Sequence, residues 1–387
     1  MANLDGFASS GFEEVERAFQ QAFTGNPKMG AGLAIFQNGH PVVNLWGGYS
    51  DQNGTERWTE DSLSVIFSCT KGLMSMLLAH LVQEGKLEYS DKVSKFWPEF
   101  AQNGKAEVTV AELVSHKAGL SAFREGLETK DIADWQKVTG VLANQAPLWR
   151  PGTGHAYHAI THGWLVGEVV RRVSGMTPGH YLKEAFGPSL AQNTWVGLPE
   201  QELPRVAEMW AAESLLSLVS EQKKQTTDAG AVWQNKAMTL GGALPMELVG
   251  PGIGFNDPDI LQAQVPGAGG VSTALDLAAI WSSTVVETNG RRILGDAILE
   301  QSLQPQSFGE QVWDAPPPWA TWGMGFQLAS PARTYLTEKS FGHDGAGGQV
   351  SFADLENKVG FAFLTNQMEG PNDVRATNII EALRRLF

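Results

Sequence analysis

The feature that most constrains the fold is a combination of helix and hairpin patterns at both ends of the sequence. Residues 11–24 place apolar residues at helical spacing, and residues 32–51 give two strands joined by Asn38-Gly39, a strong signal for a tight hairpin turn. Further along, residues 347–367 give a second hairpin and residues 374–387 a closing helix. This arrangement predicts one antiparallel sheet that is built from both chain ends and covered by the terminal helices.

The residues between these ends follow a different pattern, which indicates a mostly helical region. Residues 68–85 are largely apolar and stop at Gly85, as a buried helix with a glycine end would. Other helical patterns, separated by loops rich in proline and glycine, cover residues 108–120, 158–175 and 269–286. We therefore predict an α/β (α+β) protein with a discontinuous sheet lobe, residues 1–85 and 316–387, and a mostly helical lobe, residues 86–315.

Composition and charge exclude several classes of function. The chain has 387 residues, 42% of them hydrophobic and 18% charged, which is typical of a globular protein. Its net charge of −14 comes without a long lysine or arginine run, so the basic footprint of a nucleic-acid binder is missing. No stretch approaches the roughly 18 apolar residues of a membrane span, and the N-terminal segment lacks the pattern of a signal peptide. We expect a cytoplasmic protein with neither a nucleic-acid nor a membrane partner.

The segment Ser68-Cys69-Thr70-Lys71 carries the first candidate chemistry. At the start of a helix, positions i and i+3 lie on one face, which brings the lysine amine within reach of the serine hydroxyl. A serine needs a neighbouring base to act as a nucleophile, and lysine can serve if burial lowers its pKa. Apolar residues flank this segment, whereas the same spacing at Ser220-Glu221-Gln222-Lys223 lies among polar and charged residues. We interpret the second copy as a surface helix; for the first, a buried serine beside a helix-end lysine is the alternative to an active site.

Two glycine-rich turns supply further candidates. The turn Pro151-Gly152-Thr153-Gly154 exposes Tyr157, whose hydroxyl could act as a general acid or base if nearby cations stabilise its phenolate. Residues 342–348 hold four glycines in seven positions beside a strand, which indicates that something approaches the backbone closely, often a ligand. Taken alone, a packing tyrosine explains the first segment better than a catalytic one, and a plain glycine-rich turn explains the second about as well as a ligand.

Taken together and in this order, the three segments resemble the serine β-lactamase and penicillin-recognising family, in particular class C β-lactamases and family VIII carboxylesterases. The resemblance covers nearly the whole chain and implies a β-lactamase/transpeptidase-like fold. It implies Ser68 as the nucleophile, Lys71 as its base partner and Tyr157 as the group that passes a proton to the leaving group. It also implies an oxyanion hole made by the backbone N–H groups of Ser68 and Ala346, and a substrate-binding third motif, His343-Asp344-Gly345. Such a mechanism requires neither a cofactor nor a metal.

Two departures from the family pattern point to neutral esters as substrates. The tyrosine motif usually ends in asparagine, a handle for a substrate amide, but Tyr157-His158-Ala159 ends in alanine. The third motif of lactamases and peptidases usually begins with a lysine that holds a carboxylate, and replacing it by His343 beside Asp344 weakens the positive field. We therefore predict a serine carboxylesterase whose partner is a small-molecule ester, with weak β-lactamase or acyltransferase activity compatible with the resemblance. His158 is expected to support Tyr157 or to touch the substrate.

Loop tryptophans are candidates to line an apolar acyl pocket, because aromatic side chains provide large contact areas. These are Trp149, Trp195, Trp313, Trp319 and Trp322. The alternative for most of them is packing in the core or between the lobes.

Three other functions stay open at this point. The same site could serve a β-lactamase or an amidase acting on D-amino acids or peptides. A metal hydrolase would use His155, His158 and His162, which a helix would align on one face, although the turn at Gly154 favours a helix that starts after His155. A catalytically inactive scaffold is the non-enzyme alternative, but it has no need for a buried lysine. The single cysteine, Cys69, excludes an internal disulfide and a thiolate zinc cluster, and the sequence lacks the Gly-x-Ser-x-Gly segment of nucleophile-elbow hydrolases.

Overall fold

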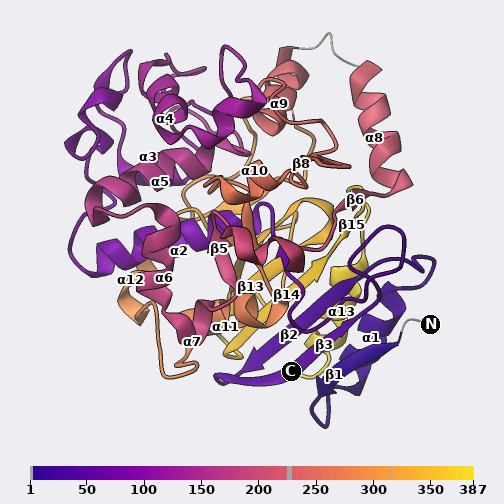
Figure 1. Cartoon of the computed structure of the whole chain (residues 1–387). Coiled ribbons are helices and arrows are strands. Elements are labelled where there is room, and N and C mark those ends of the chain that lie inside the picture. The colour runs from indigo at the N-terminus through magenta and orange to yellow at the C-terminus, as the bar shows by residue number, and fades with distance from the viewer. Residues whose placement is uncertain (1–2, 225–228, 314) are drawn as a thin grey trace.

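The computed structural model describes residues 3–224, 229–313 and 315–387 (Figure 1). Its main element is an eight-stranded antiparallel sheet in the order β1-β3-β2-β14-β13-β12-β11-β10. The strands are β1 (Leu4–Ala8), β2 (Ala31–Gln37), β3 (His40–Gly47), β10 (Thr321–Trp322), β11 (Gln327–Leu328), β12 (Ser340–Asp344), β13 (Val350–Asp354) and β14 (Val359–Thr365). Strands β2 and β14 pair in the middle of the sheet, which confirms the prediction that both chain ends build it.

The early hairpin forms where the sequence predicts it. Asn38 and Gly39 both adopt left-handed backbone angles, with φ of 52° and 81°, as a two-residue hairpin turn of the favoured hand requires. Along β2, successive side chains alternate between two separate hydrophobic cores: Leu33 and Ile35 enter one, Ala34 and Phe36 the other. The sheet is therefore buried on both faces.

Helices cover the two faces of this sheet. On one face lie the terminal helices α1 (Glu13–Ala22) and α13 (Arg375–Arg384), as predicted, and their apolar residues share a core with the sheet. On the other face lies α11 (Ala274–Val285), which contacts β2, β13 and β14. Helix α11 packs on the sheet, although its residues fall within the range predicted for the helical lobe. The division of the chain into two lobes therefore stays a prediction.

The middle of the chain is mostly helical, and Figure 1 shows it gathered beside the sheet. Its helices are α2 (Cys69–Gln83), α3 (Val110–Val114), α4 (Trp135–Asn144), α5 (Thr161–Ser174), α6 (Pro178–Phe186), α7 (Pro188–Ala191), α8 (Glu213–Lys224), α9 (Ala229–Thr239), α10 (Pro258–Gln262) and α12 (Asp296–Ser302). Short strands join them in three small sheets, β4 (Ser64–Val65) with β9 (Gly270–Ser272) and β5 (Thr194–Val196), β6 (Trp210–Ala211) with β15 (Gln367–Met368), and β7 (Val249–Gly250) with β8 (Ile253–Gly254).

The predicted helices differ from the observed ones at their ends. Helix α2 matches the prediction closely, but the pattern at 108–120 forms only the short α3, because His116 turns the chain with φ of 67°. The pattern at 158–175 becomes helical only at Thr161, and the one at 269–286 begins as strand β9. Of the polar segment that follows Ser220, residues 225–228 lie outside the described residues. In the part of the chain that the structure describes, every helix is too short or too polar to span a bilayer.

Candidate active site

The nucleophile candidate lies where a short strand turns into a buried helix. Strand β4 is followed by Phe67, which has φ of 42°, and then by Ser68, which caps the start of α2. A left-handed backbone is rare for a bulky residue and is retained where packing compensates its cost. The Phe67 ring is buried and packs edge-on against Phe255 at 5.3 Å. Packing therefore holds the turn that presents Ser68.

Lys71 lies one helical turn after Ser68 and is entirely buried. Its Nζ is 2.8 Å from Ser68 Oγ and donates a hydrogen bond to the Gly267 carbonyl at 2.7 Å. Burial holds the pKa of Lys71 well below its ordinary value, because desolvation penalises the ammonium form. A neutral amine has a lone pair to accept the serine proton, so the arrangement suits a general base.

Tyr157 completes a group of three polar side chains. The Ser68 side chain influences the pKa of the Tyr157 hydroxyl, and Lys71 Nζ lies 4.9 Å from the centre of the Tyr157 ring. The Trp322 ring stacks on the Tyr157 ring, and the two ring centroids are 5.4 Å apart. Burial raises the pKa of Tyr157, so the phenolate considered from the sequence does not form in the resting site. Tyr157 is a neutral hydroxyl, which suits proton donation.

The third motif lies on β12, beside the start of α2. The Cys69 thiol donates to the His343 carbonyl at 3.1 Å and so ties the helix to this strand. The His343 ring is buried, hydrogen-bonds the Asp344 carbonyl through Nδ1, and has a pKa held well below its ordinary value by burial. Asp344 forms an ion pair with Arg333 at 3.0 Å. A neutral imidazole and a compensated carboxylate leave the motif without the positive charge that a lysine would give, as the sequence suggested.

The glycine-rich segment after β12 is approached closely by the protein itself. A Cβ at Gly345 would collide with the Ile66 carbonyl, and one at Gly347 with the side chain of Met368. Gly345 leads directly into the 3-10 turn Ala346–Gly348, in which Gly347 has φ of 78°. The expected close approach is present, and neighbouring chain segments account for it without a ligand.

Two of the three histidines considered as metal ligands, His158 and His162, hydrogen-bond backbone groups instead. His158 accepts a hydrogen bond from the Leu120 N–H at 3.1 Å and contacts the Ala156 carbonyl at 2.7 Å, so both its ring nitrogens are engaged. His162 Nε2 contacts the Val114 carbonyl at 3.0 Å. Of the three histidines only His162 lies in α5, so His155 lies outside the helix, as the turn at Gly154 indicated, and one helical face does not align the three. The described residues contain no group of three side chains suited to hold a metal ion. This placement of His158 favours the supporting role over substrate contact.

A cavity of about 400 Å³ opens beside Tyr157 and Ala346. Most of its wall is apolar and comes from α8, α9 and the loops around them, and six of its residues are Leu215, Leu218, Val219, Met238, Leu248 and Trp313. Of the tryptophans suggested from the sequence, only Trp313 is among the described residues that line it. Trp149 packs edge-on against Trp313 at 5.7 Å. The cavity has the size and character of a site for a small apolar group.

Sequence reasoning missed two contributors to this site, Gly267 and Gln311, and named a third, Trp322, only as a candidate for the acyl pocket. The Gly267 carbonyl binds Lys71, Gln311 accepts a hydrogen bond from the Tyr157 N–H at 3.2 Å, and Trp322 stacks on Tyr157. For Gly267, the one feature of the sequence that fits its position is that it and Gly163 are both glycines. Gly163 in α5 lies against Gly267, and the contact leaves no room for a side chain. Gln311 lies in a loop and Trp322 in β10, and no local pattern connects either of them to Tyr157.

Comparisons with known proteins agree with this geometry. The sequence model of the Beta-lactamase family matches residues 15–384. An esterase/beta-lactamase, LipL, of Mycobacterium tuberculosis is 30% identical over 376 residues, which cover 95% of this chain and 83% of the relative. Two crystal structures, a family VIII carboxylesterase and a penicillin-binding protein homologue from Caulobacter crescentus, match with TM-scores of 0.87 and 0.86; each is 30% identical and covers 100% of both chains. These matches confirm the fold predicted from the three motifs.

Proposed function

Because this chain belongs to the beta-lactamase family, we propose that it is a serine carboxylesterase that works through an acyl-enzyme on Ser68. The observation that carries the proposal is one close polar contact: Lys71 Nζ lies 2.8 Å from Ser68 Oγ, and the Tyr157 ring lies beside this pair, with its centre 4.9 Å from the same Nζ. Similar proteins named as esterases support the choice of an ester substrate.

The first half of the reaction forms the acyl-enzyme. The Lys71 lone pair takes the proton of Ser68 Oγ while that oxygen bonds to the ester carbonyl carbon. The carbonyl oxygen becomes negative and is stabilised by the N–H groups of Ser68 and Ala346. The bond to the alcohol oxygen then breaks, Tyr157 gives its proton to that oxygen, and Lys71 returns the proton taken from serine to Tyr157. The alcohol leaves as a neutral molecule.

The second half releases the acid. Water enters the position that the alcohol leaves and gives up a proton to the Tyr157–Lys71 pair as its oxygen attacks the acyl carbon. The bond between Ser68 Oγ and the acyl carbon breaks, and the serine oxygen regains a proton. The balance is one water consumed for one acid and one alcohol formed.

The charges around the site favour a neutral ester over a β-lactam or a peptide with a free carboxylate. His343 is held neutral, and Arg333 is already paired with Asp344. Among the described residues that line the cavity, none is a lysine or an arginine. A substrate carboxylate would therefore lose its hydration without gaining a paired cation, which is costly in a partly buried site. An apolar acyl or alcohol group gains from the same wall.

Labelling of the active site tests the nucleophile. A fluorophosphonate probe should attach to Ser68, and Ser68→Ala should lose both labelling and hydrolysis of p-nitrophenyl butyrate, by roughly 10⁴-fold or more. Ser220→Ala is the matched control, and it should behave as the unchanged protein. Labelling at another serine, or hydrolysis retained in Ser68→Ala, would contradict the proposal.

A substrate series tests the ester preference. Hydrolysis of short p-nitrophenyl esters should exceed hydrolysis of nitrocefin and of D-amino acid amides at equal concentration. Faster turnover of nitrocefin would favour the β-lactamase alternative, and inertness towards every one of these substrates would favour the inactive scaffold. A cytoplasmic location stays a prediction from the sequence, and cell fractionation tests it.

A further inference from the structure

The turn that carries Ala346 needs outside support. It is a 3-10 turn of three residues, interrupted by the left-handed Gly347, and Gly348 follows with φ of 110°. Glycines at such angles have wide conformational freedom, so the turn does not fix its own peptide planes. An oxyanion hole works only if its N–H groups are already aimed at the developing charge. The surroundings of the turn must therefore supply its rigidity.

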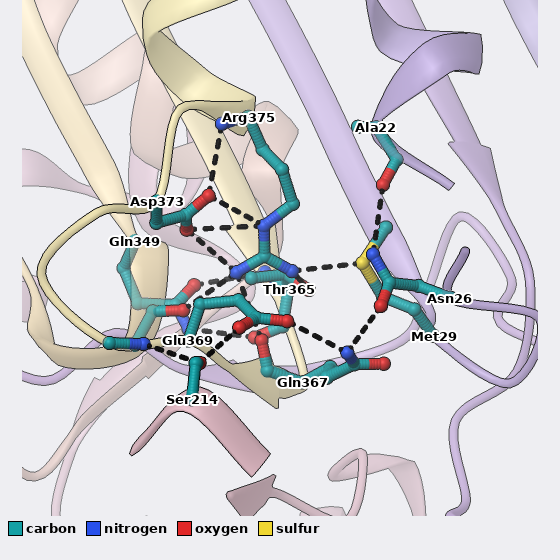
Figure 2. Close-up of polar contacts among 12 residues, drawn as sticks. Ala22, Asn26, Met29, Ser214, Gln349, Thr365, Gln367, Glu369, Asp373 and Arg375 are labelled. Atoms are coloured by element: carbon teal, nitrogen blue, oxygen red, sulfur yellow. Dashed lines mark hydrogen bonds and ion pairs between the residues drawn. The ribbon is translucent and has the colours of Figure 1, made fainter. Parts of the chain in front are cut away.

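Figure 2 shows Arg375 beside Asp373 and Gln367, and the same side chain also binds the turn directly. Its Nη2 donates to the Gly347 carbonyl and to the Gln367 carbonyl, each at 3.0 Å. The side chain is only 7% exposed and lies at the start of α13. One guanidinium thus joins the turn, strand β15 and a terminal helix.

Asp373 holds the guanidinium in place and compensates its charge. The Asp373 carboxylate accepts from Arg375 Nε at 2.9 Å and from Nη2 at 2.7 Å. This pair lies so close to the turn that a Cβ at Gly348 would collide with Asp373 and with Arg375. The ion pair therefore packs directly against the backbone of the turn.

A second hold acts on the other side of Ala346. The Gly345 N–H donates to the Gln349 carbonyl at 2.7 Å. The Gln349 side chain is buried and makes two hydrogen bonds to the Thr365 backbone in β14, at 2.7 Å and 2.9 Å. Ala346 therefore lies between two anchored peptide groups, the Gly345 N–H before it and the Gly347 carbonyl after it.

From these contacts we propose that Arg375 is a positioning residue that fixes the Ala346 N–H for its role in the oxyanion hole. The inference rests on the proposed function. An arginine is required because its planar fork donates at once to two carbonyls and a carboxylate, whereas a lysine offers a single ammonium group. The side chain is buried behind the turn and acts on the reaction through the backbone.

The test is Arg375→Lys in the full chain, assayed with p-nitrophenyl butyrate. We expect kcat to fall by about 10- to 100-fold, below the loss for deleting an oxyanion-hole donor, while KM changes by less than about twofold. The rate of fluorophosphonate labelling should fall by a similar factor, since that reaction also develops charge on an oxygen in the hole.

The matched control is Arg384→Lys in the same helix. Arg384 also donates to backbone carbonyls, those of Leu336 and Tyr335, but at the opposite end of α13 from the turn. This variant should lower the melting temperature as Arg375→Lys does and leave kcat unchanged. If Arg375→Lys folds and retains its kcat, or loses no more than Arg384→Lys, the inference is overturned.

A third variant covers the case in which Arg375→Lys does not fold. Asp373→Asn keeps the arginine but weakens its anchor, so a several-fold loss of kcat with unchanged KM is expected, and an unchanged kcat overturns the inference. The proposed function fails separately, if Ser68→Ala retains activity. Failure of this inference alone would leave Ser68→Ala inactive and both Arg375→Lys and Asp373→Asn as active as the unchanged chain.

Discussion

The chain contains the spacing serine, two residues, lysine in two places whose surroundings differ completely. Lys71 is fully buried and contacts Ser68 and the Gly267 carbonyl. Lys223 has a side chain that is 55% exposed and pairs with Glu247 at 2.9 Å on the surface. The spacing brings an amine near a hydroxyl on any helix, but only desolvation lowers the pKa of the amine enough to make it a base. The neighbours of the motif, rather than its letters, decide its chemistry.

The largest difference in activity between the two copies of the motif is expected when each lysine is replaced by arginine. Lys71→Arg keeps a long, hydrogen-bonding side chain but replaces the neutral amine by a guanidinium, which does not lose its proton in a protein. We expect kcat for p-nitrophenyl butyrate to fall by about 10³-fold, within the usual contribution of a general base. Lys223→Arg should leave kcat within about twofold. A Lys71→Arg variant with more than a tenth of the original activity would show that Lys71 is not the base.

Removing the tyrosine hydroxyl should have a smaller effect that depends on the leaving group. Tyr157→Phe keeps the ring that stacks on Trp322 and removes only the proton donor. We expect about a 10²-fold loss of kcat for alkyl esters, whose alcohol needs a proton to leave. The loss should be smaller for p-nitrophenyl esters, whose phenolate leaves more easily. Equal losses for the two kinds of ester, measured side by side, would argue against proton donation by Tyr157.

The smallest expected effect concerns stability, and its sign follows from the lowered pKa of Lys71. Between this folded pKa and the ordinary lysine value, the unfolded chain binds a proton that the folded chain does not. The free energy of unfolding therefore rises with pH across that window. Lys71→Met should be more stable than the unchanged protein near pH 7, by about 1 kcal/mol, and the difference should narrow towards about pH 10.

Denaturant titrations at several pH values measure this difference. Lys223→Met is the matched control, because its amine already lies in water in the folded protein, and its stability difference should stay near zero at every pH. A Lys71→Met difference that stays constant or widens as the pH rises would contradict a buried neutral amine.

Local patterns predicted the parts of the fold that local physics decides. The Asn38-Gly39 turn, helix α2 and the three motifs all depend on residues close together in sequence. The short α3 was not predictable, because it ends where His116 takes a left-handed conformation that packing imposes. The contact between Lys71 and Gly267 joins segments far apart in sequence, so no local pattern around either residue predicts it.

The glycine-rich turn shows the same limit in another form. The density of glycines indicated that something lies close to the backbone, and it does. The sequence did not show that one of the neighbours is the ion pair of Asp373 and Arg375, since nothing local connects that pair to Ala346. A dense run of glycines therefore predicts that another group packs closely against the backbone, but it does not identify that group.

The pairing of β2 with β14 has a consequence for how the protein is made. During synthesis the ribosome releases Ser68 and Lys71 long before the segment that forms β12, the Ala346 turn and β14. A growing chain therefore contains Ser68 and Lys71 before it contains Ala346 and the strand that completes the middle of its sheet. Hydrolytic activity is expected only after the C-terminal strands have joined the sheet.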